Sequence, residues 1–419
     1  MSREVGAPGG AVHGPSPPGA WPEGFVRKRA DRDALLVMAH LEGLTPAERH
    51  SLAWREGSAA ACVRAVSRGG VRKASARDRA MAEQVDPLVV RAALARCGAR
   101  AAAPGDDEYP PALLDLSDPP ACVFVRGGQL VPWPMSVAVV GARKCTPYGR
   151  EVAEDLGTGL ANAGLSVVSG VALGIDAAAH RGALRGGGTT AAVLGSGIDV
   201  PYPQTNKGLI EQVAGAGAVV SEYPPGVEAR PHRFPARNRL VAALARGVVV
   251  VEGAPESGSL ITVEFAGDLG REVMAVPGAV TSPLSGAPHA IIRDGAALIR
   301  DAADVLAALG IDARVAEAAG SPGGRPSESS GWPAERTQMS NLSGEERSLL
   351  ERVSGAPATL DAVAAAAGVD PAGALRLLGS LELRGLVRAD GGRYRRTRTP
   401  RHDRRAPGKE TGAGGRSRC

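Results

Sequence analysis

The sequence predicts an α/β protein built around a doubly wound, extended Rossmann-like parallel sheet, flanked by an N-terminal helical module and a C-terminal winged-helix domain. The chain has 419 residues, which exceeds one ordinary domain. Residues 136–310 alternate short β-branched runs with Ala- and Leu-rich helical stretches, the pattern of a parallel sheet covered by helices. Helical patterns lie on both sides of this part, beyond Pro-, Gly- and Ser-rich segments.

The N-terminal part predicts a small helical module. Residues 1–27 are rich in Gly and Pro and lack the apolar stretch of a secretory signal, so we expect them to be disordered. Residues 28–104 have helical periodicity in ADRDALLVMAHLEGL and DPLVVRAALARCGA, interrupted at GLTP, as in a SAM or helix-hairpin-helix module. A Pro-rich connector follows, in which ACVFVRG is typical of a strand.

The central domain spans residues 105–310 and contains six apolar runs, each ending near a Gly, Ser or acidic residue. The runs show no polar alternation, which indicates strands buried on both faces and therefore a parallel sheet. They read SVAVVG, LSVVSG, TTAAVLGSG, GAVVSEY, GVVVVEG and EVMAVPG.

The C-terminal part predicts a second folded unit between two unstructured segments. Residues 311–341 have the composition of a linker. Residues 342–395 contain three helical segments, a short strand, a DGG turn and a second strand, which together indicate a winged helix. Residues 396–419 form a basic tail that we expect to be disordered.

The charge distribution separates this tail from the folded body. The whole chain carries a net charge of +5, but residues 391–419 hold ten Lys or Arg against two Asp or Glu, which leaves residues 1–390 at −3. No window approaches about 18 uninterrupted apolar residues, so we expect no transmembrane span. The five cysteines form no CxxC pair, as is typical of reduced thiols in a cytoplasmic protein.

The end of the first strand, VAVVGARKCTPYG, presents the backbone N–H groups of a turn before a helix to an anion. Arg143 stands where a dinucleotide fingerprint requires a second Gly, and the next strand ends at Ser169 and Gly170 with no carboxylate for a ribose. No GxxxxGK[ST] motif occurs. Arg143 suits a forked hydrogen bond to a phosphate, with a structural ion pair as the alternative.

Catalytic and metal sites find little support. Asp176 and His180 lie four residues apart on one predicted helix, but no third ligand accompanies them, which favours a helix-stabilising pair over a metal site. No Ser/His/Asp or Cys/His set and no pair of catalytic carboxylates emerges. We therefore expect no catalytic residues, no metal and no cofactor.

Two further strand ends contribute to the same rim. Gly195 and Gly197 permit close approach of backbone or ligand. After VVVVEG, a predicted helix begins at Ser257, Gly258 and Ser259, with Thr262 one turn in and Asp199 and Tyr202 on the rim nearby. These serines are equally consistent with a helix N-cap and with an anion site at a helix N-terminus.

The stretch HRFPARNRL is the strongest binding signal. It surrounds Phe234 with Arg233, Arg237 and Arg239 in a chain that is 3% aromatic, and Arg230 lies just upstream. The two prolines predict an exposed loop before the helix RLVAALARG. Either Phe234 stacks on a nucleic-acid base while the arginines hold the backbone, or an arginine serves as a buried structural anchor.

Taken in order, these stretches resemble the DNA-processing protein A (DprA, also called Smf) family. The resemblance covers residues 105–310 densely. It rests on YPPALLDLSDPPACVFVRG, VVGARKCTPYG, VVSGVALGIDAAAHRGAL, AVLGSGIDVPYPQTN, SEYPPG, FPARNRLVAAL, VVVVEGAPESGSLITVEFAGDLGREVMAVPG and GAALIRDAADVL.

The resemblance implies a cytoplasmic, dimeric protein that binds single-stranded DNA in a basic pocket without catalytic turnover and helps to load the RecA recombinase on that DNA during transformation. Some family members carry Lys just before the Phe, where this chain has Pro231-His232-Arg233, so Arg233 would be a substitute. The implied DNA-binding residues are Gly141, Arg143, Ser169, Gly170, Arg233, Phe234, Arg237, Asn238, Arg239, Ser257, Gly258 and Ser259.

Two other functions remain open. Nucleotide-processing phosphoribohydrolases of the LOG type share the α/β layout, and the Ser257–Thr262 turn with Glu264 would then hold and attack a nucleotide; the chain lacks their PGGxGT turn. The winged helix would read duplex DNA through Arg376 and Arg384, although its third helix is apolar for that role.

Overall fold

The computed structural model describes residues 20–311, 343–353, 358–383, 386–390 and 392–396, which form two compact units divided near Pro322. The first 19 residues, nearly all of the predicted linker and nearly all of the basic tail lie outside the described residues. Among the described residues no single helix is long and apolar enough to cross a membrane. One helix pair with a bend of 100°, Leu360–Ala367 with Pro371–Glu382, passes that test together.

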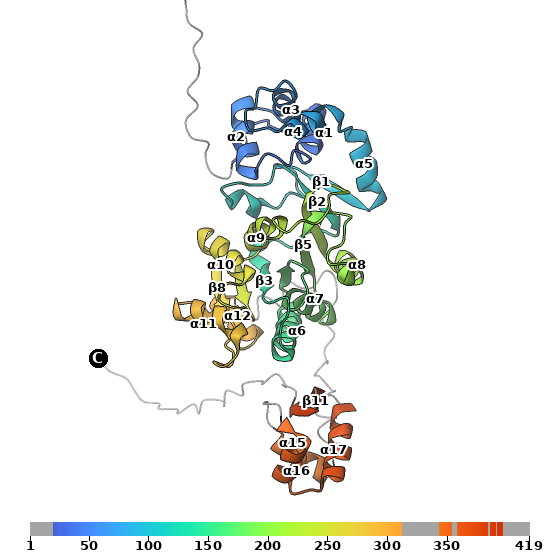
Figure 1. Ribbon diagram of the computed structural model, residues 1–419, viewed down its shortest axis with the longest axis vertical. Helices are drawn as coiled ribbons and strands as arrows, with labels where there is room; N and C mark the ends of the chain where they lie inside the picture. The colour runs from blue at the N-terminus through green and yellow to red at the C-terminus, as the bar shows by residue number, and fades with distance from the viewer. Residues whose placement is uncertain (1–19, 312–342, 354–357, 384–385, 391, 397–419) are drawn as a thin grey trace, which may run out of the picture. The chain divides into compact units, whose positions relative to one another are not determined.

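The first unit begins with five short helices (Figure 1). Thr45 and Ser75 start the second and fourth of them through capping boxes. Phe25 is 2% exposed and stacks on Trp21, so the core of this module includes residues that the sequence places in a disordered segment. The helices are α1 (Arg29–Met38), α2 (Pro46–Glu56), α3 (Ala59–Ser67), α4 (Ala76–Gln84) and α5 (Pro87–Arg96).

A nine-stranded sheet follows, in the order β1-β2-β6-β5-β4-β3-β7-β8-β9. The six predicted apolar runs form β3 to β8 and are all parallel, which confirms the doubly wound sheet. The predicted connector strand is β2, which pairs antiparallel with β6; β1 and β9 were not predicted. The strands are β1 (Ala99–Ala102), β2 (Val123–Gly127), β3 (Ser136–Val140), β4 (Ser166–Ser169), β5 (Thr190–Gly197), β6 (Ala218–Tyr223), β7 (Gly247–Val250), β8 (Glu272–Ala275) and β9 (Ala297–Leu298).

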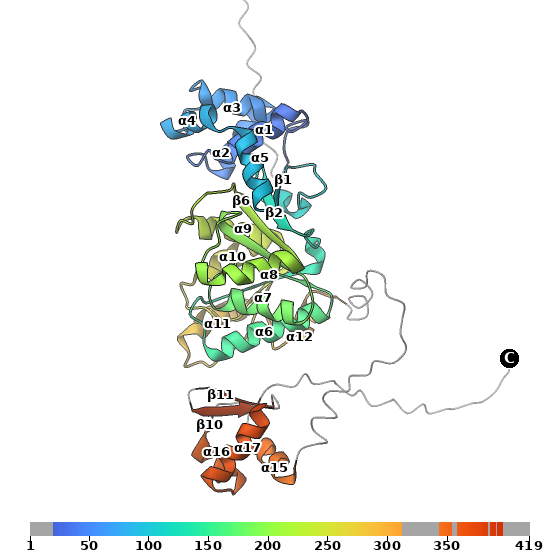
Figure 2. The same cartoon turned by 90° about the vertical axis from the view of Figure 1, so that its right-hand side faces the viewer.

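Alternate side chains of β3 enter two of the three cores of the first unit. Val137 and Val139 of β3 pack with α6, α7 and α12, whereas Ala138 and Val140 pack with α9, α10 and α11. Figure 2 shows α6, α7 and α8 grouped together along the sheet. The helices are α6 (Pro147–Asn162), α7 (Ile175–Arg185), α8 (Lys207–Ala216), α9 (Arg233–Ala243), α10 (Gly258–Asp268), α11 (Gly286–Arg293) and α12 (Ala302–Ala308), with 3-10 turns at Pro111–Asp115, Trp133–Met135, Gln204–Asn206 and Pro283–Ser285.

The strand order places a switch point at β3. The chain runs outward from β3 through β4, β5 and β6, and then returns through α9 to the other side of β3 to form β7, β8 and β9. Crevices at the carboxyl ends of strands around such a point are the usual ligand sites of open α/β sheets. The carboxyl ends of β3, β4 and β7 are therefore where a site is expected.

The second unit has the helices and hairpin of the predicted winged helix. Its core contains Leu349, Val363 and Leu378, and its small sheet has the order β10-β12-β11, with β10 not predicted. The elements are α15 (Gly344–Arg352), β10 (Ala358–Thr359), α16 (Leu360–Ala367), α17 (Pro371–Leu383), β11 (Val387–Asp390) and β12 (Arg393–Arg396). Arg376 is exposed on α17, and Arg384 lies outside the described residues.

Candidate nucleic-acid interface

A pocket of about 260 Å³ lies where the carboxyl ends of β3 and β4 meet the N-terminal parts of α9 and α10. It brings together most of the residues that the sequence proposed. Nine of the twelve line it: Gly141, Arg143, Gly170, Phe234, Arg237, Asn238, Ser257, Gly258 and Ser259. Ser169, Arg233 and Arg239 are not among its lining residues.

The turn after β3 supplies an exposed cation. Arg143 makes no ion pair with a carboxylate of the described residues, and its guanidinium carbon lies 5.3 Å from the centroid of the Phe234 ring. Glu252, buried at the end of β7, accepts hydrogen bonds from the backbone N–H of Thr146 at 2.8 Å and from its hydroxyl at 2.5 Å. This carboxylate ties the turn that carries Arg143 to the neighbouring strand.

The turn after β4 forms the floor of the pocket. The Ser169 hydroxyl is fully buried and donates to the Val139 carbonyl at 2.7 Å, so it serves the fold. A Cβ on Gly170 would overlap the Arg237 guanidinium, which explains the glycine. Val171 adopts a φ of 56°, a strained value for a β-branched residue, and Asn206 holds its carbonyl through Nδ2 at 2.9 Å.

Asp176 and His180 do not pair with each other, contrary to the expectation from their spacing. Asp176 accepts from the backbone N–H groups of Gly170 and Ala172, whereas His180 contacts the Thr190 hydroxyl through Nδ1 at 2.6 Å. Burial raises the pKa of Asp176 and lowers that of His180 to about 3. Asp176 therefore supports the turn after β4, whereas His180 contacts the start of β5.

The Phe-containing stretch begins a helix, and the expected exposed loop is wrong. Helix α9 starts at Arg233, so Pro235 occupies the first turn, where its missing N–H leaves no helical hydrogen bond unmade. The helix turns Phe234, Arg237, Asn238 and Val241 toward the pocket, the spacing of one helical face. We call this set the pocket face of α9.

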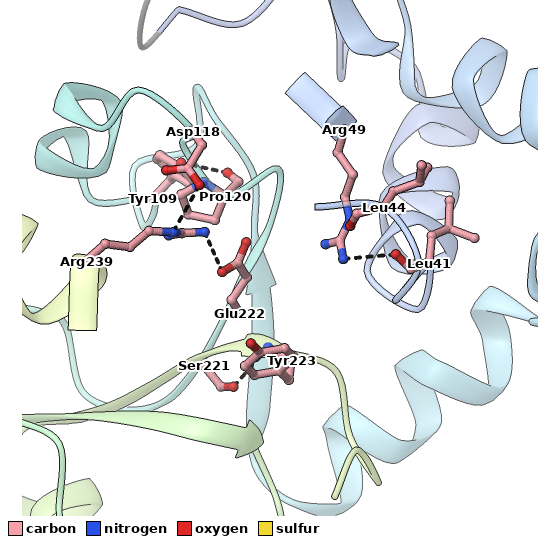
Figure 3. Close-up of polar contacts among 10 residues, drawn as sticks. All are labelled: Leu41, Leu44, Arg49, Tyr109, Asp118, Pro120, Ser221, Glu222, Tyr223 and Arg239. Carbon is pink, nitrogen blue, oxygen red and sulfur yellow. Dashed lines mark hydrogen bonds and ion pairs between the residues drawn. The ribbon is translucent and has the colours of Figure 1, made fainter. Parts of the chain in front are cut away.

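Two of the predicted DNA-binding arginines point away from the pocket and are buried ion pairs. Arg233 is 3% exposed and binds Glu42 at 2.8 Å. Arg239 donates to Glu222 at 2.7 Å and lies 3.4 Å from Asp118 (Figure 3). We call Arg233 and Arg239 the anchored face of α9. The burial of Arg239 matches the buried helix anchor that the sequence left open for Arg237 or Arg239, whereas Arg233 was expected to contact DNA.

Arg237 is buried as well, but it lies under the pocket. Its guanidinium donates to the Val193 carbonyl and lines both the main pocket and an adjoining one of about 70 Å³. Burial lowers its pKa to about 10, partly offset by Asp176, so it remains a cation at neutral pH. Its Nε atom has no partner among the described residues.

Phe234 forms a half-buried wall between the two pockets. Its ring centroid is 5.0 Å from that of Tyr202, at an interplanar angle of 35°. A Cβ on Gly195 would lie 2.9 Å from the Phe234 ring, so the close approach expected of this glycine is to Phe234. Tyr202 remains 45% exposed, which leaves an aromatic surface at the rim.

The N-terminus of α10 completes the pocket. Ser257 caps the helix by accepting from the Ser259 N–H at 3.3 Å, and the two hydroxyls lie 2.8 Å apart. Asn238 donates to the Gly258 carbonyl at 3.2 Å and so joins the two helices. A helix N-terminus beside Arg143 favours an anion.

The lining of the pocket consists mainly of cationic, hydroxyl, amide and apolar groups. Asp176 is the one carboxylate among the lining residues and is occupied by backbone N–H groups. Glu264, the acid of the alternative hydrolase, is exposed and does not line the pocket. No cluster of metal-ligating side chains occurs in the part of the chain that the structure describes.

Sequence reasoning missed several residues that build the site. Glu252, Asp118 and Glu42 act through partners more than 100 residues away in the chain. Only Glu252 had a signal, as the acid at the end of an apolar run beside a glycine turn.

The chain matches known protein families over most of its described residues. The family model described as DNA recombination-mediator protein A matches residues 100–310, and one described as the DprA winged helix domain matches residues 333–393. A putative DNA processing protein DprA from Mycobacterium tuberculosis is 40% identical over 315 residues, covering 72% of this chain and 78% of that protein.

Two solved structures are also similar. The DNA processing protein A of Streptococcus pneumoniae has a TM-score of 0.53 and 34% identity, covering 67% of this chain and 98% of that chain. The Helicobacter pylori protein, described for its single-stranded DNA binding mode, has a TM-score of 0.46 and 28% identity, covering 50% of this chain and 95% of that chain.

Proposed function

This chain belongs to the DNA recombination-mediator protein A family of DNA-processing proteins, and we propose that it binds single-stranded DNA in the strand-end pocket. Phosphates would lie along Arg143 and the N-terminus of α10, with a base against Phe234. The observation that carries the proposal is the position of Arg143, an exposed cation above an aromatic ring and beside a helix N-terminus.

The preference for single strands follows from the ring. An unpaired base can leave its neighbours and stack on an aromatic side chain, which contributes about 1–3 kcal/mol per base. In a duplex the faces of the bases are already stacked on each other, so no base is free to stack on the Phe234 ring. The electrostatic part of the binding, through Arg143, should fall with salt.

The specific cellular role is a further step of the proposal. We propose that the protein acts as a cytoplasmic homodimer and recombination mediator that helps to load the RecA recombinase on single strands during DNA uptake and transformation. Family membership supports this role. It predicts that the protein speeds the assembly of RecA filaments on strands already covered by a single-strand binding protein, and unchanged assembly would contradict it.

We also propose that the pocket does not turn over a substrate. The exposed position of Glu264 supports binding over the phosphoribohydrolase alternative, as does the occupied carboxylate of Asp176. Incubation with purine nucleoside monophosphates should release no free base. Release of base in proportion to protein concentration would favour the hydrolase.

The binding itself is tested by fluorescence anisotropy with single-stranded and duplex oligonucleotides across a salt series. We expect a clear preference for the single strand and a linear loss of log affinity with log salt. Equal affinity for both forms, or binding that is lost when the basic tail beyond residue 396 is removed, would contradict a role for the pocket.

A further inference from the structure

The first turn of α9 is held by a residue of the helical module. Arg233 is 3% exposed, and the carboxylate that neutralises it belongs to Glu42, 2.8 Å away and 191 residues earlier in the chain. The same guanidinium donates to the Glu228 carbonyl and lies 4.9 Å from the centroid of the Tyr223 ring. A buried cation of this kind depends on its partner, because an unpaired charge is costly to bury.

The loop that presents Glu42 is itself fixed. Arg49, half-buried in the module, donates to the carbonyls of Leu41 and Leu44 at 3.0 Å each, on either side of Glu42 (Figure 3). The Gly43 N–H donates to Asp78 at 2.9 Å, and a Cβ on Gly43 would overlap that carboxylate. The backbone around Glu42 therefore has little freedom to follow Arg233 if α9 shifts.

Glu42 also reaches the chain just before the helix. Arg230 lies 3.6 Å from its second carboxylate oxygen, so one carboxylate contacts residues on the N-terminal side of Phe234 at two points. Phe234 follows Arg233 directly, and the rest of the pocket face, Arg237, Asn238 and Val241, follows within about two turns. The rotation of the first turn of α9 thus sets where the ring and the guanidinium of Arg237 lie.

We propose that Glu42 is a positioning residue for single-stranded DNA binding, through which the helical module orients the pocket face of α9. The inference rests on the proposed function of the pocket. Glu42 does not line the pocket and contacts no DNA in this account. It acts through Arg233, and most of its effect on binding passes through the ring of Phe234, the next residue.

The test uses the full-length protein and begins with two variants. Glu42→Gln removes the charge and keeps the shape, and Asp33→Asn is its matched control, because Asp33 lies in the same module, has a 32% exposed side chain against 29% for Glu42, and pairs with the exposed Arg91. We expect Glu42→Gln to weaken single-strand binding about 2- to 30-fold, the usual range for a residue that acts through a network. Asp33→Asn should bind as the wild type does.

A double-mutant cycle separates positioning from general destabilisation. In a Phe234→Ala background the Glu42→Gln loss should largely disappear, because the ring that Glu42 orients is absent. A full loss in that background, wild-type binding by Glu42→Gln, or an equal loss in Asp33→Asn would overturn the proposal. Failure of the wild-type protein to bind single strands would instead contradict the proposed function.

A second variant covers the case in which Glu42→Gln does not fold. Glu42→Asp keeps the charge but moves it back by one methylene. Circular dichroism should show that this variant is folded, and fluorescence anisotropy should show an intermediate loss of single-strand affinity. Wild-type affinity in a folded Glu42→Asp would overturn the proposal if Glu42→Gln is unfolded.

Discussion

The two faces of α9 carry the same residue type and use it in opposite ways. On the anchored face, Arg233 and Arg239 are buried against carboxylates. On the pocket face, Arg237 is buried under a cavity and makes no ion pair with a carboxylate of the described residues, although Asp176 partly offsets the effect of burial on its pKa. Above it, Arg143 is exposed beside Phe234. A cluster of arginines in the sequence therefore indicates neither binding nor structure, and the partner carboxylates decide between them.

The largest expected effect lies on the anchored face. Arg239→Met should lower the free energy of unfolding by about 3–5 kcal/mol, because it leaves the buried Glu222 and the partly exposed Asp118 without their cation. Urea denaturation measures it. The control is Arg300→Met, whose pair with Asp304 is exposed to solvent, so its loss should change the free energy of unfolding far less. Similar losses of stability in the two variants would contradict the claim that the buried ion pair of Arg239 stabilises the fold more than an exposed one.

The floor of the pocket comes next. Gly170→Ala should destabilise the protein by about 1–3 kcal/mol and weaken single-strand binding, because the new methyl group must displace the Arg237 guanidinium. Gly267→Ala is the control, since a Cβ there meets nothing within 4 Å. Unchanged binding and stability in Gly170→Ala would show that Arg237 is free to move.

The pH dependence of stability tests His180 beneath the same floor. Burial and the nearby Arg237 lower its pKa to about 3, so the unfolded chain takes up a proton below about pH 6.5 while the folded protein does not. Above that pH the ring is neutral in both the folded and the unfolded protein, so His180 does not lower the free energy of unfolding. As the pH falls toward 3, the free energy of unfolding decreases by at most about 1.4 kcal/mol per pH unit through this residue.

His180→Asn provides the measurement. The variant has no titrating ring, so between about pH 6 and about pH 4 its free energy of unfolding should fall less steeply than that of the wild type. Urea denaturation at several pH values gives the two slopes. Parallel slopes would mean that His180 titrates normally in the folded protein.

The smallest effect on stability is expected at the exposed cation. Arg143→Gln should change the free energy of unfolding by no more than about 0.5 kcal/mol. It should reduce the slope of log affinity against log salt by about 0.7, the share of one phosphate on a single strand. An unchanged slope would remove Arg143 from the phosphate contacts.

The sequence predicted the strands β2 to β8 because their runs are locally apolar. It missed β9, with two residues, and β1, which has a charged residue in ARAA. It also took the two prolines around Phe234 for turns, although Pro235 is tolerated in the first helical turn.

The candidate site was predictable in composition and less so in role. The glycines and serines of the strand ends were found because their residue types are required by the turns. The roles of Arg233 and Arg239 were not predictable, because their partners Glu42 and Asp118 come from distant parts of the chain. Only the folded structure shows which arginine forms an ion pair with a carboxylate.

The most direct test of the contrast between the two faces is fluorescence anisotropy of Phe234→Ala with a single-stranded oligonucleotide, together with its urea denaturation. We expect binding to weaken by about 1–3 kcal/mol, the value of one stacked base, while the protein remains folded. Wild-type affinity in the folded variant would contradict the account, because the pocket face of α9 would then bind no base.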